Sequence, residues 1–501
     1  MTVAQRCSTF LLATLACLGA AACSDSSAPR PLSAGLHILS GAPASDTIGA
    51  VLPTPLTVIL VDSSGKGIPN RPVTFEDFSV APPYVGYVMI AIPARTPGFT
   101  GKVTVMSDNA GRASILMQCG GVAGVAAVVI SAPDAPAFDT ARVTVLPGAP
   151  VGVQAFPSDS AVYVGHHFAL RGTMVDQAYN PIAHSVVQYS ALTPDIAISN
   201  GQLSGVAIGR GSYVVSATIG GVVHTDTGRV SVVPPGVLAA SDGAHIYLLN
   251  TDGSNFRLLA TTPNGNLHWA PSGAEIAFNT VGSGVDSVIQ AVDTLGHVRA
   301  ITSPTIGGLH EAPQYSRDGQ WIYFARVGTY PGTLPSLWRV HPDGSGAAQI
   351  SALGDYNYPS PSPDGTQLAF EAQTPDVYSA FNAVVTSLTI STGTLSTLDL
   401  AGAEPVWSPV ANTIAYVNQL GGGNDQGPIW VVSADGTGAH QVGTGNYNPG
   451  PDWSPDGQWL VAPANGNSTF DFVLEIVNAQ SGLRLRLEFL WPRSLTAAWR
   501  P

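Results

Sequence analysis

The architecture of the C-terminal half follows from one stretch, Trp453-Ser454-Pro455-Asp456-Gly457, and the apolar run after it, Gln458-Trp459-Leu460-Val461-Ala462. Positions equivalent to Trp453 recur every 46 residues, and all but one of them are aromatic. They are Trp269, Tyr315, Pro361, Trp407, Trp453 and Trp499. Repetition at this length predicts a stacked or ring-shaped array, because one unit cannot bury its own apolar face.

Each repeat predicts four short strands. In the unit that begins at Trp453, the Asp456-Gly457 turn leads into a second strand at 458–462, a third at 472–477 and a fourth at 483–489. Asp-Gly supplies the positive φ that a tight hairpin needs. The recurring aromatic residue is expected to pack between neighbouring sheets.

The Trp-Ser-Pro-Asp-Gly signature resembles the repeat of TolB-type β-propellers. It is intact at 453–457 and departs most at Trp407, where Val410-Ala411 stands in place of Asp-Gly. The resemblance covers residues 236–501 and implies a six-bladed β-propeller. The last strand, ending at Trp499, is then expected to pair with the segment after residue 236, which closes the ring and leaves only short edges.

Two further all-β modules precede the array. Residues 33–148 predict a β-sandwich; the strand at 56–62 and the turn at 108–111 resemble a bacterial Ig-like domain of the invasin group. Residues 149–235 predict a second sandwich, in which Pro194-Asp195-Ile196-Ala197 and the Asn200-Gly201 hairpin turn resemble the other common bacterial Ig-like group. The predicted fold class is therefore all-β, with two Ig-like sandwiches followed by a propeller.

The composition agrees with this class and excludes one kind of partner. The 501 residues include 55 glycines and 40 prolines, and only 11% are charged. Such a chain is typical of short strands joined by turns. The net charge of −13, with no basic cluster along the chain, argues against a nucleic-acid partner.

Residues 1–22 predict a targeting segment. Arg6 precedes an apolar stretch at 10–22 that is too short for a stable membrane span. Leu18-Gly19-Ala20-Ala21-Ala22-Cys23 resembles a bacterial lipobox, which implies lipidation of Cys23, a flexible tether at 23–32 and a cell-envelope location, with the outer membrane favoured by Ser24. The alternatives are a plain secretory signal cut after Ala20 or Ala22, and lipidation at Cys17.

Catalytic motifs are missing from the sequence. It has no Gly-x-Ser-x-Gly elbow, His-Glu-x-x-His pair, Walker loop or Cys-x-x-Cys. We therefore expect no cofactor and no metal site. Cys119, in an apolar segment, is expected to be a buried and inert thiol.

Aromatic and amide residues gather in the predicted loops on one side of the propeller. The candidate binding face comprises His310, Tyr330, Tyr356, Asn357, Tyr358, Tyr378, Phe381, Tyr447, Asn448 and Trp491. Such side chains suit protein or glycan recognition when they are exposed. Alternatively, they pack the loops against one another.

Three functions follow from these features. The first is a non-enzymatic envelope lipoprotein whose propeller face binds an envelope protein or a polysaccharide, with the Ig-like domains as a spacer. The second is an envelope hydrolase or lyase that uses the propeller channel. The third is a surface adhesin that acts through the Ig-like domains.

Overall fold

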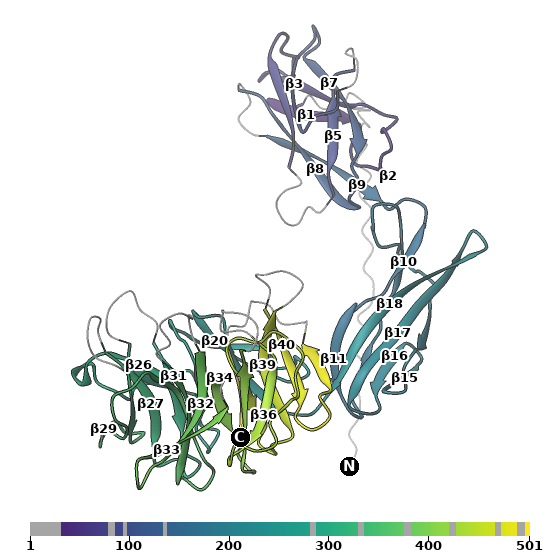
Figure 1. Cartoon of the computed structure of the whole chain (residues 1–501). Helices are drawn as coiled ribbons and strands as arrows, with labels where there is room; N and C mark the ends of the chain where they lie inside the picture. The colour runs from purple at the N-terminus through teal and green to yellow at the C-terminus, as the bar shows by residue number, and fades with distance from the viewer. Residues whose placement is uncertain are drawn as a thin grey trace, which may run out of the picture. The chain divides into compact units, whose positions relative to one another are not determined.

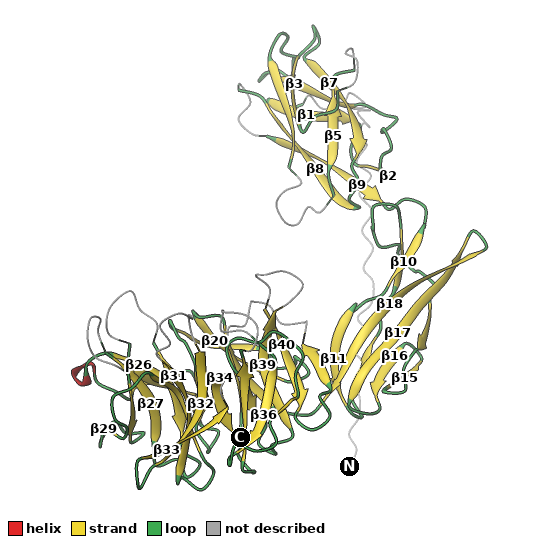
Figure 2. Ribbon diagram, viewed as in Figure 1, coloured by secondary structure: helices red, strands yellow, loops and turns green. Residues whose placement is uncertain are grey.

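The computed structural model describes residues 32–78, 86–93, 98–133, 138–280, 287–328, 335–374, 382–399, 401–419, 427–465, 472–487 and 496–501. Within these ranges the regular structure is β-strand, apart from the 3-10 turn η1 (Pro304–Ile306) (Figure 2). The chain divides into two compact units between Gly148 and Ala149.

The first unit is a two-sheet sandwich. Its strands are β1 (Gly35–Ser40), β2 (Ala44–Thr47), β3 (Leu56–Val61), β4 (Pro72–Asp77), β5 (Val88–Ala91), β6 (Lys102–Met106), β7 (Arg112–Cys119), β8 (Gly124–Ser131) and β9 (Asp139–Leu146). One sheet has the order β1-β3-β7-β5 and the other β2-β9-β8-β4-β6. Their facing sides form one core that includes Val58, Phe75 and Val128. Cys119 belongs to this core, and burial raises the pKa of its thiol.

The second unit begins with further strands that form three small sheets. The strands are β10 (Gly152–Gln154), β11 (Asp159–Tyr163), β12 (His167–Ala169), β13 (Thr173–Val175), β14 (Gln188–Ala191), β15 (Ile196–Ser199), β16 (Gln202–Gly205), β17 (Gly209–Ile219) and β18 (Val222–Val233). The sheets are β11-β18-β17-β14, β12-β16-β15 and β10-β13. Asn200 and Gly201 both have positive φ, 51° and 70°, in the tight β15–β16 hairpin that this dipeptide predicts.

Residues after 236 form four-stranded antiparallel sheets, which we number 1 to 6 along the chain (Figure 1). Sheet 1 consists of β19 (Val237–Ser241), β20 (His245–Asn250), β21 (Arg257–Thr261) and β42 (Thr496–Trp499); sheet 2 of β22 (Leu267–Trp269), β23 (Glu275–Asn279), β24 (Ile289–Asp293) and β25 (Val298–Ala300). Sheet 3 consists of β26 (Leu309–Tyr315), β27 (Ile322–Val327), β28 (Ser336–Val340) and β29 (Ala348–Gln349); sheet 4 of β30 (Tyr356–Pro361), β31 (Gln367–Thr374), β32 (Asn382–Thr389) and β33 (Thr394–Asp399). Sheet 5 consists of β34 (Gly402–Trp407), β35 (Thr413–Asn418), β36 (Ile429–Ser433) and β37 (His440–Gln441); sheet 6 of β38 (Asp452–Trp453), β39 (Trp459–Asn465), β40 (Phe472–Asn478) and β41 (Arg484–Leu487).

The C-terminal strand belongs to sheet 1. Strand β42 pairs antiparallel with β19, in a register that sets Leu238 opposite Trp499 and Ser241 opposite Thr496. It becomes the inner strand of that sheet, as β22, β26, β30, β34 and β38 are in the others. The recurring aromatic residues pack between sheets: Trp269 shares a core with Ala239 and Ile246 of sheet 1.

The repeated Ser-x-Asp-Gly turn has one recurring hydrogen-bond pattern. The Ser454 hydroxyl lies 2.5 Å from Oδ1 of Asp456 and accepts from the backbone N–H of Trp459 at 2.9 Å. Equivalent contacts occur at Ser316 and Ser362. The turn therefore fixes the angle between the inner and second strands of each of these sheets.

Candidate functional site

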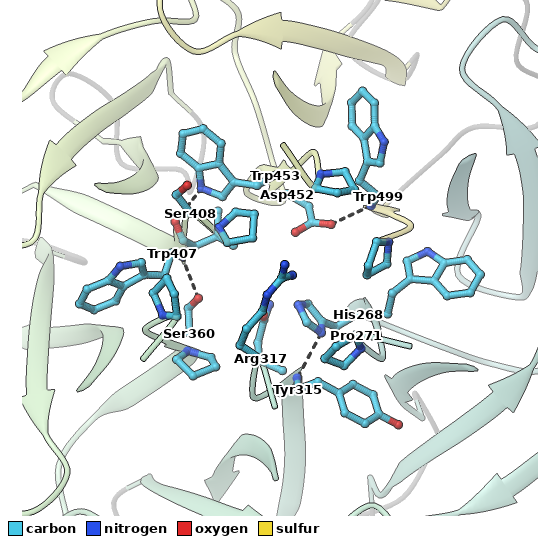
Figure 3. A pocket seen from close by; sticks show the side chains of 18 residues that line it. His268, Pro271, Tyr315, Arg317, Ser360, Trp407, Ser408, Asp452, Trp453 and Trp499 are labelled. Atoms are coloured by element: carbon cyan, nitrogen blue, oxygen red, sulfur yellow. Dashed lines mark hydrogen bonds between the residues drawn. The ribbon is translucent and has the colours of Figure 1, made fainter. Parts of the chain in front are cut away.

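The inner strands of sheets 1 to 6 surround an axial cavity with an empty volume of about 630 Å³ (Figure 3). Every one of these strands contributes to its lining. The contributors include His268, Tyr315, Pro361, Trp407, Asp452 and Trp499.

Polar side chains in this cavity join neighbouring sheets. At three positions spaced by 92 residues, a side chain accepts a hydrogen bond from a backbone N–H of the next inner strand. Nδ1 of His268 accepts from Tyr315 (3.1 Å), Oγ of Ser360 from Trp407 (2.8 Å), and Oδ2 of Asp452 from Trp499 (2.7 Å) (Figure 3). These three side chains therefore connect sheets 2 and 3, 4 and 5, and 6 and 1.

Other junctions use a different bond. The Trp269 indole N–H donates to the carbonyl oxygen of Ala498 at 3.3 Å, and the Trp453 indole N–H donates to that of Val406 at 3.0 Å. At the remaining junction, between sheets 3 and 4, the corresponding residues are Gln314 and Pro361. Proline has no backbone N–H to donate, so this bond cannot form. The pattern of acceptor side chain and indole donor thus follows the chemistry available at each repeat.

The charges around the cavity are set by burial. Burial lowers the pKa of His268 to about 4, so the imidazole is neutral near pH 7. Burial raises the pKa of Asp452 to about 7, although backbone N–H groups of Trp499 and Trp453 oppose the rise. Arg317 is exposed, and its side chain reaches toward the middle of the cavity in Figure 3.

A second pocket, with an empty volume of about 520 Å³, lies toward the starts of the same inner strands. We call it the loop-side pocket, because the connections from each preceding sheet arrive at this end. Its lining includes Asn266, Ala312, Tyr358, Glu404, Pro449 and Thr496. Gln314, Val406 and Asp452 line both pockets, so the two are neighbouring parts of one axial opening.

The backbone of the loop-side pocket is strained in a repeated way. Ala312, Tyr358 and Glu404 are spaced by 46 residues, and each has a φ of 50°. Each lies where the pairing of the inner strand with the second strand shifts register. A left-handed conformation costs a residue with a side chain about 1–2 kcal/mol, and such strain concentrates at functional sites.

Carboxylates surround this strained segment. Glu404 accepts a hydrogen bond from the backbone N–H of Gly450, and its own N–H donates to Oε2 of Glu371 at 3.2 Å. Burial raises the pKa of Glu311, which precedes Ala312. Burial also raises the pKa of Asp355, against a hydrogen bond from Asn357. Of the acidic side chains in this region, Glu404 and Asp452 line the pocket itself.

The structure brings three of the predicted binding residues to this region. Tyr356, Asn357 and Tyr358 are half-buried on β30, and Tyr358 lines the loop-side pocket. The ring of Tyr356 packs edge-on against Phe370, with centroids 4.9 Å apart. Of the three, Tyr358 is placed best to meet a ligand.

Two other predicted residues are not exposed. Tyr447 is 0% exposed, because its ring fills the core of sheets 5 and 6 and its hydroxyl donates to Oε2 of Glu475 at 2.7 Å. His310 is 0% exposed as well, and its Nδ1 lies 2.8 Å from the Thr302 hydroxyl. The expectation that these side chains present themselves to a ligand is wrong; both pack the structure beneath the loops.

The remaining predicted residues divide into two groups. Asn448 is half-buried beside Pro449. Cys23, Tyr330, Tyr378, Phe381 and Trp491 lie outside the described residues.

Sequence reasoning missed the polar side chains of the axis. His268, Ser360 and Asp452 each stand one position before a residue of the 46-residue repeat series, Trp269, Pro361 and Trp453. The equivalent Gln314 and Val406 also line the axial cavity, whereas Ala498 is buried in the core between sheets 1 and 2. The 46-residue spacing could therefore have identified these positions from the sequence.

No group of three or more His, Cys, Asp or Glu side chains suited to a metal ion occurs in the part of the chain that the structure describes. In the same residues, helices with the length and hydrophobicity of a membrane span are absent.

Comparisons with known proteins give likenesses of limited extent. No protein-family model matches the chain. An uncharacterized protein of Agrobacterium fabrum is 32% identical over 184 residues, which cover 34% of this chain and 61% of that protein. The chain thus spans less than two thirds of the length of this relative.

Solved structures with similar folds include TolB proteins. TolB from Acinetobacter baumannii is 18% identical with a TM-score of 0.45, over 62% of this chain and 83% of that one. A putative TolB from Agrobacterium tumefaciens is 16% identical with a TM-score of 0.41, over 51% and 89%. Identities this low do not carry an activity from those proteins to this chain.

Proposed function

We propose that this protein is a non-enzymatic binding protein of the cell envelope. Sheets 1 to 6 form a closed six-bladed propeller, whose loop-side pocket receives part of a protein partner. The two N-terminal sandwiches are Ig-like domains that act as a spacer. Cys23 carries the lipid anchor, with the outer membrane as the favoured location.

The observation that carries the proposal is the use of the polar groups on the axis. His268, Ser360 and Asp452 each accept a hydrogen bond from the neighbouring sheet. A general base or nucleophile must instead direct its reactive atom at a substrate. One polar atom of each side chain is used to join neighbouring sheets, which favours a scaffold over a catalytic centre.

The chemistry of the loop-side pocket indicates what kind of group it receives. Glu404 and Asp452 offer carboxyl oxygens, and Tyr358 adds an aromatic ring. We therefore propose that the partner is a protein that inserts a lysine or arginine side chain, since a cation binds both carboxylates and aromatic faces.

Site-specific photo-crosslinking in intact cells tests this proposal. A photoreactive amino acid at Tyr358 is expected to give one discrete crosslinked protein, which Glu404→Gln weakens. The matched control replaces Thr392, which lies in the β32–β33 turn, and is expected to give none. The same products from both positions, or none from Tyr358, would contradict the proposal; a polysaccharide ladder would replace the protein partner with a glycan.

A second candidate function is hydrolysis or cleavage of an envelope polysaccharide on the axis. The observation in its favour is Asp452, whose raised pKa of about 7 would suit a general acid. Envelope polysaccharides incubated with the purified protein and with Asp452→Asn separate the two candidates. Cleavage that the substitution abolishes would establish the enzyme, and no cleavage by either protein would leave the binding function.

A further inference from the structure

A basic cleft lies between the second sandwich and sheet 6, within the second compact unit. Its empty volume is about 1110 Å³, and four arginines line it together with Asp159. They are Arg210 of β17, Arg229 of β18, and Arg484 and Arg486 of β41. The whole sequence has 20 lysines and arginines and a net charge of −13, so this grouping runs against the overall charge.

The walls of the cleft are held in place by hydrogen bonds. Nε of Arg210 donates to the carbonyl oxygen of Arg484 at 2.6 Å. The Ser231 hydroxyl donates to that of Arg486 at 3.0 Å. Beside the cleft, Ala161 and Val233 of the sandwich share a core with Leu487 of sheet 6. The cleft is therefore a built feature of the unit, positioned by polar and apolar contacts.

One side of the cleft is organised by a buried carboxylate. The Glu475 side chain is 0% exposed and accepts hydrogen bonds of 2.7–2.8 Å from Arg484 and Arg486. Burial opposes its ionisation, but these hydrogen bonds outweigh burial and hold the pKa of Glu475 below its usual range. Two guanidinium groups thus meet one carboxylate, which leaves one positive charge in excess.

The other side adds a second positive charge. In the β11-β18-β17 sheet, Arg229 pairs in register with Asp159 on one neighbouring strand and with Ser212 on the other. Arg210 pairs with Ser231 and so lies on the diagonal from Arg229, on the same face of the sheet. Among the described residues, the Arg229 guanidinium has no hydrogen-bond acceptor, and Arg210 uses only its Nε. Four arginines against Asp159 and Glu475 leave an excess of two positive charges.

We propose that this cleft binds a phosphate monoester, either as a free solute or as a lipid headgroup. A phosphate monoester carries a charge of about −1.5 to −2 near pH 7, which matches the excess in the cleft. Guanidinium groups pair with phosphate oxygens in a planar, two-pronged geometry that ammonium groups cannot offer. Arg229 and Arg210 supply the N–H donors. Arg484 and Arg486, held by Glu475, add positive electrostatic potential to the cleft.

The test uses the full chain and a variant that leaves the cleft walls in place. Arg229→Gln removes a charge but no hydrogen bond, whereas Arg210→Gln also loses the bond to Arg484. The matched control is Arg142→Gln on the exposed face of β9 in the first unit, which makes the same change of charge elsewhere. Binding of inorganic phosphate is measured by calorimetry at fixed ionic strength, and binding of phosphatidic acid–phosphatidylcholine vesicles by flotation.

The wild type and Arg142→Gln are expected to bind phosphate equally. Arg229→Gln is expected to bind it about tenfold more weakly or worse, because it loses one charge-assisted hydrogen bond. Binding of free phosphate alone identifies a solute, and much tighter binding of phosphatidic acid vesicles identifies a headgroup. The proposal fails if neither probe binds or if Arg229→Gln binds as the wild type does. It also fails if galacturonate, a sugar carboxylate without phosphate, competes as well as phosphate. Equal melting temperatures of Arg229→Gln and wild type without ligand exclude misfolding as the cause.

Discussion

Replacement of Asp452 by asparagine is expected to stabilise the protein more at pH 8 than at pH 5. The Asp452 carboxyl accepts the backbone N–H of Trp499 at 2.7 Å, and its pKa is raised from 3.8 to about 7 by burial. Below pH 3.8 the group is protonated in both the folded and unfolded states. Between pH 3.8 and 7 the folded state holds the proton more tightly, so stability falls as the pH rises through this window.

The size of the effect follows from the two pKa values. At about 1.4 kcal/mol per pKa unit, ionisation of Asp452 at pH 8 costs at most about 4 kcal/mol of folding stability. Water in the axial cavity reduces this figure, because the side chain is not fully buried. Asparagine keeps the acceptor oxygen and cannot ionise. We therefore expect Asp452→Asn to gain about 2–4 kcal/mol over wild type at pH 8.

Urea unfolding followed by tryptophan fluorescence measures this difference. All nine tryptophans lie after residue 236, so the signal reports the propeller sheets and not the sandwiches. Ser360→Ala is the matched control, since Ser360 accepts the N–H of Trp407 from the equivalent position without titrating. It is expected to lose about 1–2 kcal/mol at both pH values. A difference between Asp452→Asn and wild type that is the same at pH 5 and pH 8 would refute the reasoning.

Three substitutions and one deletion test other contacts. In urea unfolding, the stability of His268→Gln relative to wild type is expected to be up to about 2 kcal/mol higher at pH 5 than at pH 8. The reason is that burial lowers the pKa of His268 from 6.5 to about 4, so the wild type loses stability as the pH falls between those values. An equal difference at both pH values would contradict this. Deletion of 496–501, or Trp499→Ala, is expected to lower the unfolding free energy by about 3–5 kcal/mol or more, since Trp499 is 4% exposed and pairs with β19; a thermal melt equal to that of the full chain would show that β42 does not close the ring. Glu475→Ala is expected to cost about 3–5 kcal/mol in a thermal or urea melt, because it leaves two arginines without their buried partner; a loss below 1 kcal/mol would mean that water replaces the carboxylate.

The repeat spacing predicted the strands well, because each turn is encoded locally. The Asp456-Gly457 turn and the Asn200-Gly201 hairpin require positive φ, and those residue types adopt it readily. The direction of side chains in the loops was harder to predict. Tyr447 was expected at the surface, yet it is buried because Glu475, distant in sequence and on a different strand, supplies a partner for its hydroxyl. Spacing alone does not reveal such a partner.

The alternation of hydrogen bonds around the axis bears on the proposed closure of the ring. Side-chain acceptors at His268, Ser360 and Asp452 define a unit of two sheets, repeated every 92 residues. Such a two-sheet pattern continues without a break around a ring only if the number of sheets is even. It does continue across the seam, which is the junction of sheet 6 with the C-terminal strand β42 in sheet 1. Asp452 accepts the N–H of Trp499 in β42, and the Trp269 indole donates to the carbonyl oxygen of Ala498 in the same strand. An open array would gain nothing from matching its last strand to both neighbours, so this agreement favours a closed six-bladed ring. It also makes the seam the junction whose acceptor is a carboxylate, which would couple ring closure to pH.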